Sequence, residues 1–243
     1  MAADLGKRLE QAVGWFWRTR REQALRQQEG GRTDRGGRSA VTGGAQMDGF
    51  ARLLADLVTD AGVPEATVYG KRRLELPGFF RPTKEWDLLV VHEGRLLVAV
   101  EVKAQVGPSF GNNFNNRVEE ALGSAVDLWT AYREGVFSPS PRPWLGYLML
   151  LEDCAGSRSP VAVRQPHFAT LPEFQEASYA GRYEQFCLKI VRERHYDAAA
   201  FIISKRPEGE GVLYTEPSAE LGFTRFAASL RAHVQAYAEE EVR

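Results

Sequence analysis

Apolar residues recur every three or four positions in five stretches of the chain, and this spacing predicts amphipathic helices. The stretch at 46–60 is the clearest, because its large apolar residues fall on one stripe: Met47, Phe50, Leu53, Leu54, Leu57 and Val58. The predicted helices cover residues 5–28, 46–60, 117–133, 173–194 and 218–240. Asn116 is the predicted N-cap of the third helix, with Glu119 three residues on in a variant of the capping box.

Runs of aliphatic and β-branched residues between these helices predict strands. They cover residues 68–76, 87–91, 96–102, 144–151 and 199–204, with a turn at 92–95. This order of helices and strands predicts an α/β fold with a mixed central sheet flanked by helices on both faces. The length of 243 residues fits a single domain spanning 1–243.

Composition adds only a few constraints. Hydrophobic residues make up 44% and charged residues 26% of the chain, with a formal net charge of −1, which is ordinary for a globular protein. Two cysteines do not make a disulfide framework, so we expect a cytoplasmic protein. No apolar run is long enough to span a bilayer, so we expect no membrane partner. The near-neutral charge counts against a bulk nucleic-acid binder but leaves room for one basic face.

A segment rich in glycine and arginine, at about 29–45, interrupts the helical pattern and predicts a mobile loop. It contains Arg32, Arg35 and Arg38. Two interpretations stay open for these residues. The segment is either a solvated linker or a basic arm that contacts DNA phosphates.

Two acids and a lysine lie on neighbouring predicted strands joined by the tight turn. Asp87 opens the first strand, and Glu101 and Lys103 lie at the end of the second. Because strand side chains alternate, Glu101 and Lys103 share one face of their strand, and the valines of 98–102 form the other. Phosphodiester hydrolysis needs oxygen ligands for Mg²⁺ and benefits from an ammonium that orients water and stabilises negative charge. The alternative is a solvent-facing Glu–Lys pair, since so short a motif is weak evidence.

A shared metal site requires Asp87 and Glu101 on the same face of the sheet. A regular two-residue turn would set Asp87 opposite Val100, which is the wrong face. A three-residue loop that pairs His92 with Leu96 would set Asp87 opposite Glu101. We therefore predict the His92–Leu96 register, or a bulge that restores the same parity.

The arrangement resembles the PD-(D/E)XK nucleases, and the longer sequence resembles the XhoI family of type II restriction endonucleases. The resemblance is carried mainly by Trp86-Asp87, by the run from Glu101-Val102-Lys103 to Arg117, and by the segments 144–147 and 166–168. It implies a restriction-endonuclease-like core, two Mg²⁺ ligands in Asp87 and Glu101, and a catalytic lysine in Lys103. The backbone carbonyl of Val102 is implied as a further Mg²⁺ ligand.

The chain departs from the PD-(D/E)XK pattern at one position. Trp86 stands where the motif has proline, which weakens the motif but not the mechanism, because the proline is not a chemical participant. Some sites of this superfamily add an acid from the preceding helix, and Asp48 is the candidate here. A favourable interaction with the helix dipole is the simpler explanation for Asp48.

The segment after the catalytic strand is rich in amides and predicts contacts with DNA bases. Asparagine can pair with adenine and arginine with guanine in the major groove. The alternative is turn and cap chemistry, for which glycine and asparagine are the usual residues. The predicted DNA-binding residues are Gln105, Ser109, Asn112, Asn113, Asn115, Asn116 and Arg117.

These observations predict a homodimeric, Mg²⁺-dependent restriction enzyme that cleaves both strands of double-stranded DNA at a short palindrome. The resemblance implies CTCGAG or a related site, 5′-phosphate ends with a 5′ overhang, and a cognate DNA methyltransferase in the same system. Two alternatives remain. One is a repair or recombination nuclease that recognises DNA structure, and the other is a DNA-binding module that has lost cleavage.

Overall fold

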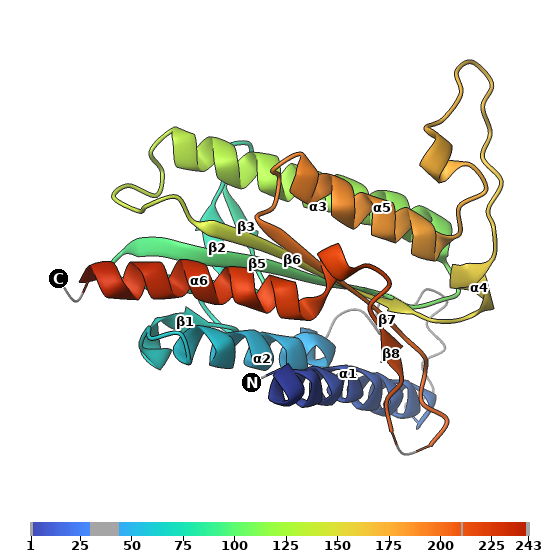
Figure 1. Ribbon diagram of the computed structural model, residues 1–243, viewed down its shortest axis with the longest axis horizontal. Helices are drawn as coiled ribbons and strands as arrows, with labels where there is room; N and C mark the ends of the chain where they lie inside the picture. The colour runs from blue at the N-terminus through green and yellow to red at the C-terminus, as the bar shows by residue number, and fades with distance from the viewer. Residues whose placement is uncertain (1, 30–43, 210, 242–243) are drawn as a thin grey trace.

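Within residues 2–29, 44–209 and 211–241, which the computed structural model describes, six strands form a mixed sheet between two layers of helices (Figure 1). The strand order is β1-β4-β5-β6-β7-β8. The neighbours β5, β6 and β7 run parallel, and the other pairs are antiparallel. The bounds are β1 Val68–Tyr69, β4 Leu88–His92, β5 Arg95–Gln105, β6 Trp144–Glu152, β7 Ala198–Ser204 and β8 Tyr214–Thr215. The α/β fold with a mixed, helix-flanked sheet is therefore confirmed.

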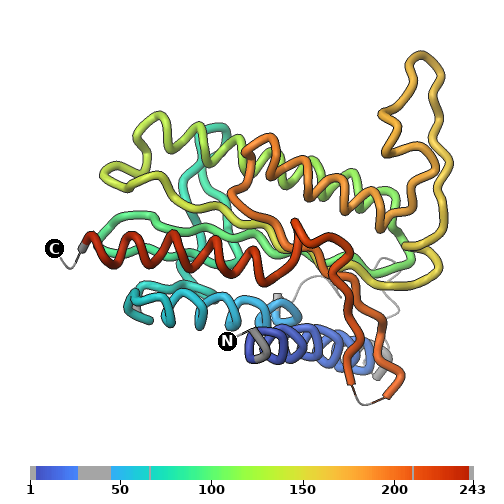
Figure 2. The backbone as a smooth tube through the Cα atoms, in the orientation of Figure 1, coloured from blue at the N-terminus to red at the C-terminus, as the bar shows by residue number. Residues whose placement is uncertain are grey.

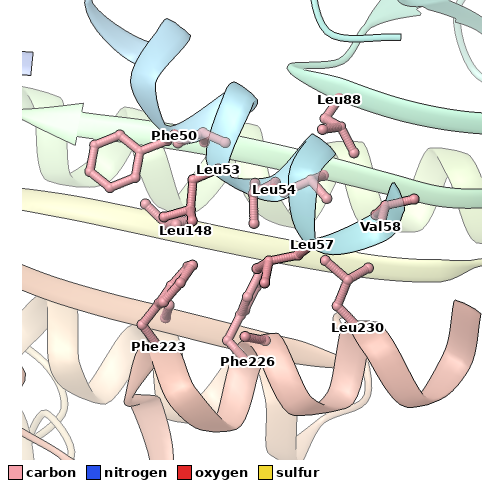
Figure 3. Close-up of a cluster of buried hydrophobic side chains, with 14 of the residues drawn as sticks. Phe50, Leu53, Leu54, Leu57, Val58, Leu88, Leu148, Phe223, Phe226 and Leu230 are labelled. Carbon is pink, nitrogen blue, oxygen red and sulfur yellow. The ribbon is translucent and has the colours of Figure 1, made fainter. Parts of the chain in front are cut away.

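Three helices cover one face of the sheet. They are α1 (Ala2–Glu29), α2 (Asp48–Thr59) and α6 (Phe223–Glu241). The predicted apolar stripe of α2 turns inward and packs in the same buried cluster as Leu148 of β6 and Phe226 of α6. Figure 3 shows Leu54 and Leu57 pointing toward the sheet and α6. Burial of such a stripe, rather than helix propensity, supplies most of the stability of a helix this short.

The other face carries α3 (Phe110–Arg133) and α5 (Tyr179–Arg192), which pack against each other. A short helix, α4 (Ala155–Arg158), follows β6, and a separate hairpin pairs β2 (Glu75–Pro77) with β3 (Thr83–Glu85). Single 3-10 turns lie at Gly44–Met47, Glu65–Thr67, Pro172–Phe174 and Ala219–Leu221. The tube in Figure 2 shows residues 159–178 projecting from the body beside the first turn of α5.

Both faces of β5 are covered, which decides the environment of the candidate site. Val98, Val100 and Val102 pack in the cluster under α2 and α6, and Ala99 packs in the cluster under α3 and α5. The predicted alternation is confirmed. Glu101 therefore points toward the α3 and α5 layer, where it is only 3% exposed. The alternative of a solvent-facing Glu–Lys pair is therefore excluded, because Glu101 is buried.

Several predicted elements begin or end elsewhere, and two of them show the reason in the backbone. The strand predicted at 68–76 is broken into β1 and β2, because the chain turns between them and Arg73 has a φ of 59°. The helix predicted at 173–194 begins at Tyr179, where the Ser178 hydroxyl caps it by accepting from the Gly181 amide at 3.2 Å. Glu176, with a φ of 54°, prevents an earlier start.

Residues 30–43, which contain Arg32, Arg35 and Arg38 of the predicted mobile loop, lie outside the described residues. In the part of the chain that is described, no helix has the length and apolarity of a bilayer span.

Candidate active site

The β4–β5 hairpin sets the relative position of the two candidate acids. Its turn has two residues, Glu93 and Gly94, both at positive φ (49° and 75°), which is the type I′ geometry favoured between twisted strands. The predicted His92–Leu96 register is therefore wrong, since His92 pairs with Arg95.

A bulge then restores the parity that a shared site needs. Val91 pairs with Leu96 but Val90 pairs with Val98, so Leu97 is the extra residue on β5. From there the register runs to Leu88 opposite Val100, and one step further sets Asp87 opposite Glu101. The alternative form of the prediction, a bulge, is confirmed.

Backbone hydrogen bonds fix the Asp87 carboxylate against the end of β5. The Asp87 amide donates to the Val100 carbonyl at 3.1 Å, and the Val102 amide donates to Asp87 Oδ2 at 2.7 Å. The amide and carbonyl of one strand residue point to the same side of the strand. The Val102 carbonyl therefore faces the same edge as the Asp87 carboxylate, which suits a further oxygen ligand there.

Two lysines hold the buried Glu101 carboxylate. Lys103 Nζ pairs with Glu101 Oε1, and Lys84 Nζ pairs with Glu101 Oε2 at 2.6 Å. Both partners are largely enclosed, since the side chains of Lys103 and Lys84 are 25% and 12% exposed. The site thus combines two carboxylates with two ammonium groups.

Burial and mutual charge perturb all three predicted catalytic residues. Burial, and then the negative charge of Glu101, raise the pKa of Asp87 to about 6. Burial also raises the pKa of Glu101, but the ammonium groups of Lys103 and Lys84 outweigh it and leave that pKa below its usual value. Burial lowers the pKa of Lys103, yet the negative charges of Glu101 and Asp87 raise it more. Such opposed shifts are typical of functional sites.

The donor set suits a hard divalent cation. Asp87, Glu101 and the Val102 carbonyl offer only oxygen atoms, which Mg²⁺ prefers. Among the described residues no cluster of three or more His, Cys, Asp or Glu side chains could hold a metal. Two carboxylates are nevertheless enough for Mg²⁺, which usually keeps several waters and uses substrate phosphate oxygens as well.

Asp48 lies on the opposite side of the sheet from this site. It begins α2, which packs in the cluster that contains Val98 and Val100. Its carboxylate pairs with Lys71 at 3.6 Å. The structure therefore does not bring Asp48 to Asp87 and Glu101.

The amide-rich segment is helical, which corrects the predicted boundary. α3 begins at Phe110 with Ser109 at the N-cap position, so Asn116 lies two turns inside the helix and is not its cap. Asparagine is a poor helix former, but Phe110 and Phe114 are one turn apart and pack on Tyr179 and Tyr183, with ring centroids 5.7 and 5.0 Å apart. This packing outweighs the propensity.

The chain's four asparagines all lie on the first two turns of α3, and three of them are exposed: Asn112, Asn115 and Asn116. Asn113 donates to the Ser109 carbonyl at 2.6 Å. Arg117 pairs with Glu120, its side chain is 20% exposed, and its charge reaches Lys103. The helix thus presents a row of amides at its positive end, next to the candidate site.

Gln105 does not belong to this exposed row. It is 2% exposed, and its amide donates to the carbonyls of Val106 at 2.9 Å and Ser109 at 3.2 Å. Gln105 therefore supports the turn into α3 from inside. Ser109 itself is exposed at the start of the helix.

One neighbour of the site, Lys84, is not predicted from the sequence, and neither is its contact with Trp86. Lys84 Nζ lies 4.3 Å from the centroid of the Trp86 ring. The only signal in the sequence is that Lys84 precedes Asp87 by three residues. Nothing local indicates that its side chain reaches β5.

A basic cavity of about 520 Å³ is lined by α1 and by the segment that precedes β8. Trp17 and Arg206 of this lining bond to Ser204 and Glu152, so the cavity lies at the carboxyl ends of β7 and β6. Figure 1 shows where α1 and β8 lie. Its cationic lining residues are Arg18, Arg20, Arg21 and Arg206. Burial, and then the charge of Arg206, lower the pKa of Arg20. Arg206 pairs at 3.1 Å with Glu152, which accepts from the Gly107 amide at 2.8 Å, so this cavity adjoins the end of β5.

Comparison with known proteins finds similarity over most of the chain. The family described as "Restriction endonuclease XhoI" matches residues 26–216. The chain is 53% identical to the type II restriction enzyme BstVI of Geobacillus stearothermophilus over 206 residues, which cover 83% of this chain and 92% of the relative. It is 47% identical to the type II restriction enzyme XhoI of Xanthomonas vasicola, over 79% of this chain and 78% of the relative. No solved structure matches the chain.

Proposed function

Because the chain belongs to the XhoI family of restriction endonucleases, we propose that it cleaves both strands of DNA at CTCGAG or a related palindrome. The products are 5′-phosphate ends with a 5′ overhang, and the reaction requires Mg²⁺. The observation that carries this proposal is the meeting of Asp87, Glu101 and Lys103 at the end of β5, where the bulge sets the two acids opposite each other.

Each residue of the site has a chemical part in hydrolysis. Asp87, Glu101 and the Val102 carbonyl would hold Mg²⁺, which when bound offsets the phosphate charge and lowers the pKa of water. The Lys103 ammonium orients the attacking water and stabilises negative charge that develops on the phosphate. Burial excludes bulk solvent from Glu101 and strengthens these interactions.

Recognition of the base sequence falls to the start of α3. Its exposed asparagines are suited to bidentate pairing with adenine, and its N-terminal end favours a nearby phosphate. A palindromic site is matched by a two-fold symmetric dimer that brings one active site to each strand. We therefore also propose a homodimer, with a cognate methyltransferase that protects the same site in the host.

Replacing Asn116 with alanine is expected to reduce discrimination more than general DNA affinity. A lost bidentate base contact costs about 1–3 kcal/mol at the correct base only. Binding to cognate duplexes and to duplexes with one altered base pair, measured by fluorescence anisotropy, checks this. Glu119→Gln on the next turn is the control. Full site preference in variants at Asn112, Asn115 and Asn116 would show that this row is structural.

The basic cavity is expected to bind the DNA backbone. Arg20→Ala combined with Arg21→Ala should lower the slope of log affinity against log salt by about 2, because each lost phosphate contact lowers it by roughly 0.9. Sequence preference should stay the same. The matched control is Arg133→Ala with Arg194→Ala, near the amino ends of the parallel strands. An unchanged slope would remove this cavity from the DNA surface.

Plasmids with and without one CTCGAG site test the proposed chemistry. With Mg²⁺ the enzyme should linearise only the plasmid that has the site, and EDTA should stop the reaction. Methylation of the site should protect it. Nicking of both plasmids at DNA junctions or damage would instead indicate a structure-specific repair nuclease, and specific binding without cleavage would indicate a DNA-binding module.

A further inference from the structure

A second lysine reaches the catalytic glutamate from outside the central sheet. Lys84 lies on β3, its side chain is 12% exposed, and its Nζ is 2.6 Å from Glu101 Oε2. We propose that Lys84 is a positioning residue that holds the Glu101 carboxylate, so that Lys103 is free to act on the substrate. The inference rests on the proposed function, since it assigns a role within the same site.

The chain passes directly from the hairpin of β2 and β3 into the catalytic strands. The Trp86 amide donates to the Leu74 carbonyl at 2.9 Å, within the hairpin region, and the next amide, of Asp87, donates to Val100 of β5 at 3.1 Å. Two consecutive residues therefore connect two sheets. The position of Lys84 relative to Glu101 is fixed by this crossover.

The far end of the hairpin is fixed as well. The buried Asp127 of α3 accepts from the amides of Phe79 and Phe80 at 2.8 and 2.7 Å and pairs with Arg81 Nε at 2.7 Å. A side chain at Gly78 would place its Cβ 2.4 Å from Asp127 Oδ2, so the turn approaches α3 as closely as a backbone can. With both ends held, the hairpin is a rigid support for Lys84.

Trp86 completes the arrangement and gives a reason for the departure from the proline of the motif. The tryptophan is 3% exposed, and Lys84 Nζ lies over its ring at 4.3 Å from the ring centroid. An ammonium over an aromatic face is attracted by the ring quadrupole. Proline has no such face. Trp86 therefore directs Lys84 onto Glu101 while its backbone continues into Asp87.

The two lysines can have different roles because they bind different oxygens of the Glu101 carboxylate. Lys103 pairs with Oε1 and Lys84 with Oε2. When Lys103 turns to the water and the phosphate, a buried carboxylate with a single cationic partner would lose its only hydrogen-bond donor. Lys84 remains as a cationic donor on Oε2. Glu101 then remains oriented through the catalytic cycle.

Isosteric replacement separates charge from shape at this position. Lys84→Met keeps the length and the apolar stem, and Lys84→Arg keeps the positive charge. Lys7→Met, on an exposed position of α1, is the matched control. Single-turnover cleavage with Mg²⁺ is one readout. The second does not depend on cleavage: it is the Ca²⁺ concentration that half-maximally tightens binding to cognate DNA, measured by fluorescence anisotropy.

Lys84→Met is expected to slow cleavage about tenfold or more and to raise the half-maximal Ca²⁺ concentration several-fold, as for other residues that orient a metal ligand. Lys84→Arg should restore most of both, and Trp86→Phe should give a smaller loss than Lys84→Met. Thermal unfolding confirms that each variant is folded. If Lys84→Met fails to fold, the same two readouts are measured on Lys84→Gln and Trp86→Phe instead.

The inference is overturned if Lys84→Met matches a cleaving wild type in both readouts. It is also overturned if Met and Arg are equally impaired, because shape rather than charge would then matter. A wild-type enzyme that does not cleave with Mg²⁺ would instead overturn the proposed function, so the two failures are distinguishable.

Discussion

Lys103→Ala is expected to lower the single-turnover rate of DNA cleavage by about 10²–10⁴-fold, the usual cost of losing a proton-transfer group or a charge-stabilising donor. Specific DNA binding should remain largely intact, because the ammonium acts on water and phosphate and not on base edges. The rate is measured at saturating enzyme and Mg²⁺ on a duplex with one cognate site. Binding is measured in Ca²⁺, which should support it without efficient cleavage.

Lys7→Ala, at an exposed position on the opposite layer of helices, is the control for loss of a lysine. It should cleave at the wild-type rate. Near-normal cleavage by Lys103→Ala would contradict the catalytic assignment, even if the variant lost some affinity for DNA.

Asp87→Asn is expected to inactivate the enzyme and to stabilise its metal-free form above neutral pH. The pKa of Asp87 in the folded protein is about 6, against an ordinary value of 3.8. Between these values the folded state binds more protons than the unfolded state, so stability falls as pH rises through this window. Above it the penalty is complete, at about 3 kcal/mol. An asparagine still accepts the Val102 amide and carries no charge.

Urea unfolding in EDTA at about pH 8 and about pH 4 measures the predicted difference. The Asn variant should be more stable than wild type at the higher pH, and the difference should shrink to about 0.5 kcal/mol at the lower, which lies just above the ordinary pKa of an aspartate. Asp153→Asn is the control of opposite sign, because a hydrogen bond from Arg158 lowers the pKa of Asp153 and its charge therefore stabilises the fold at neutral pH. An Asp87→Asn variant less stable than wild type at about pH 8 would contradict the electrostatic description of the site.

The register of the β4–β5 hairpin could be predicted only in part from the local sequence. A shared metal site requires Asp87 and Glu101 on one face of the sheet, and strand alternation then limits the connection to a longer loop or a bulge. The choice between them depended on Leu97, which the structure makes the extra residue under α2 and α6. That choice is made by packing between distant parts of the chain, which local sequence does not record.

The start of α3 could not be predicted for a related reason. Glycine and asparagine dominate residues 111–116, and their intrinsic preferences favour turns. The helix forms there because Phe110 stacks on Tyr179 and Phe114 packs edge-to-face on Tyr183, two tyrosines of α5 that lie far along the chain. Lys84 was missed in the same way, since its contact with Glu101 joins two separate sheets.

Digestion of a library of duplexes with randomised sequence, followed by sequencing of every new end, tests the central claim most directly. With Mg²⁺ the wild-type enzyme should produce ends at a single palindrome, CTCGAG or a close relative, each with a 5′-phosphate and a 5′ overhang. Glu101→Gln, treated in parallel, should produce none. Ends scattered over unrelated sequences, or equal cleavage by the Glu101 variant, would contradict the claim that this site performs sequence-specific hydrolysis.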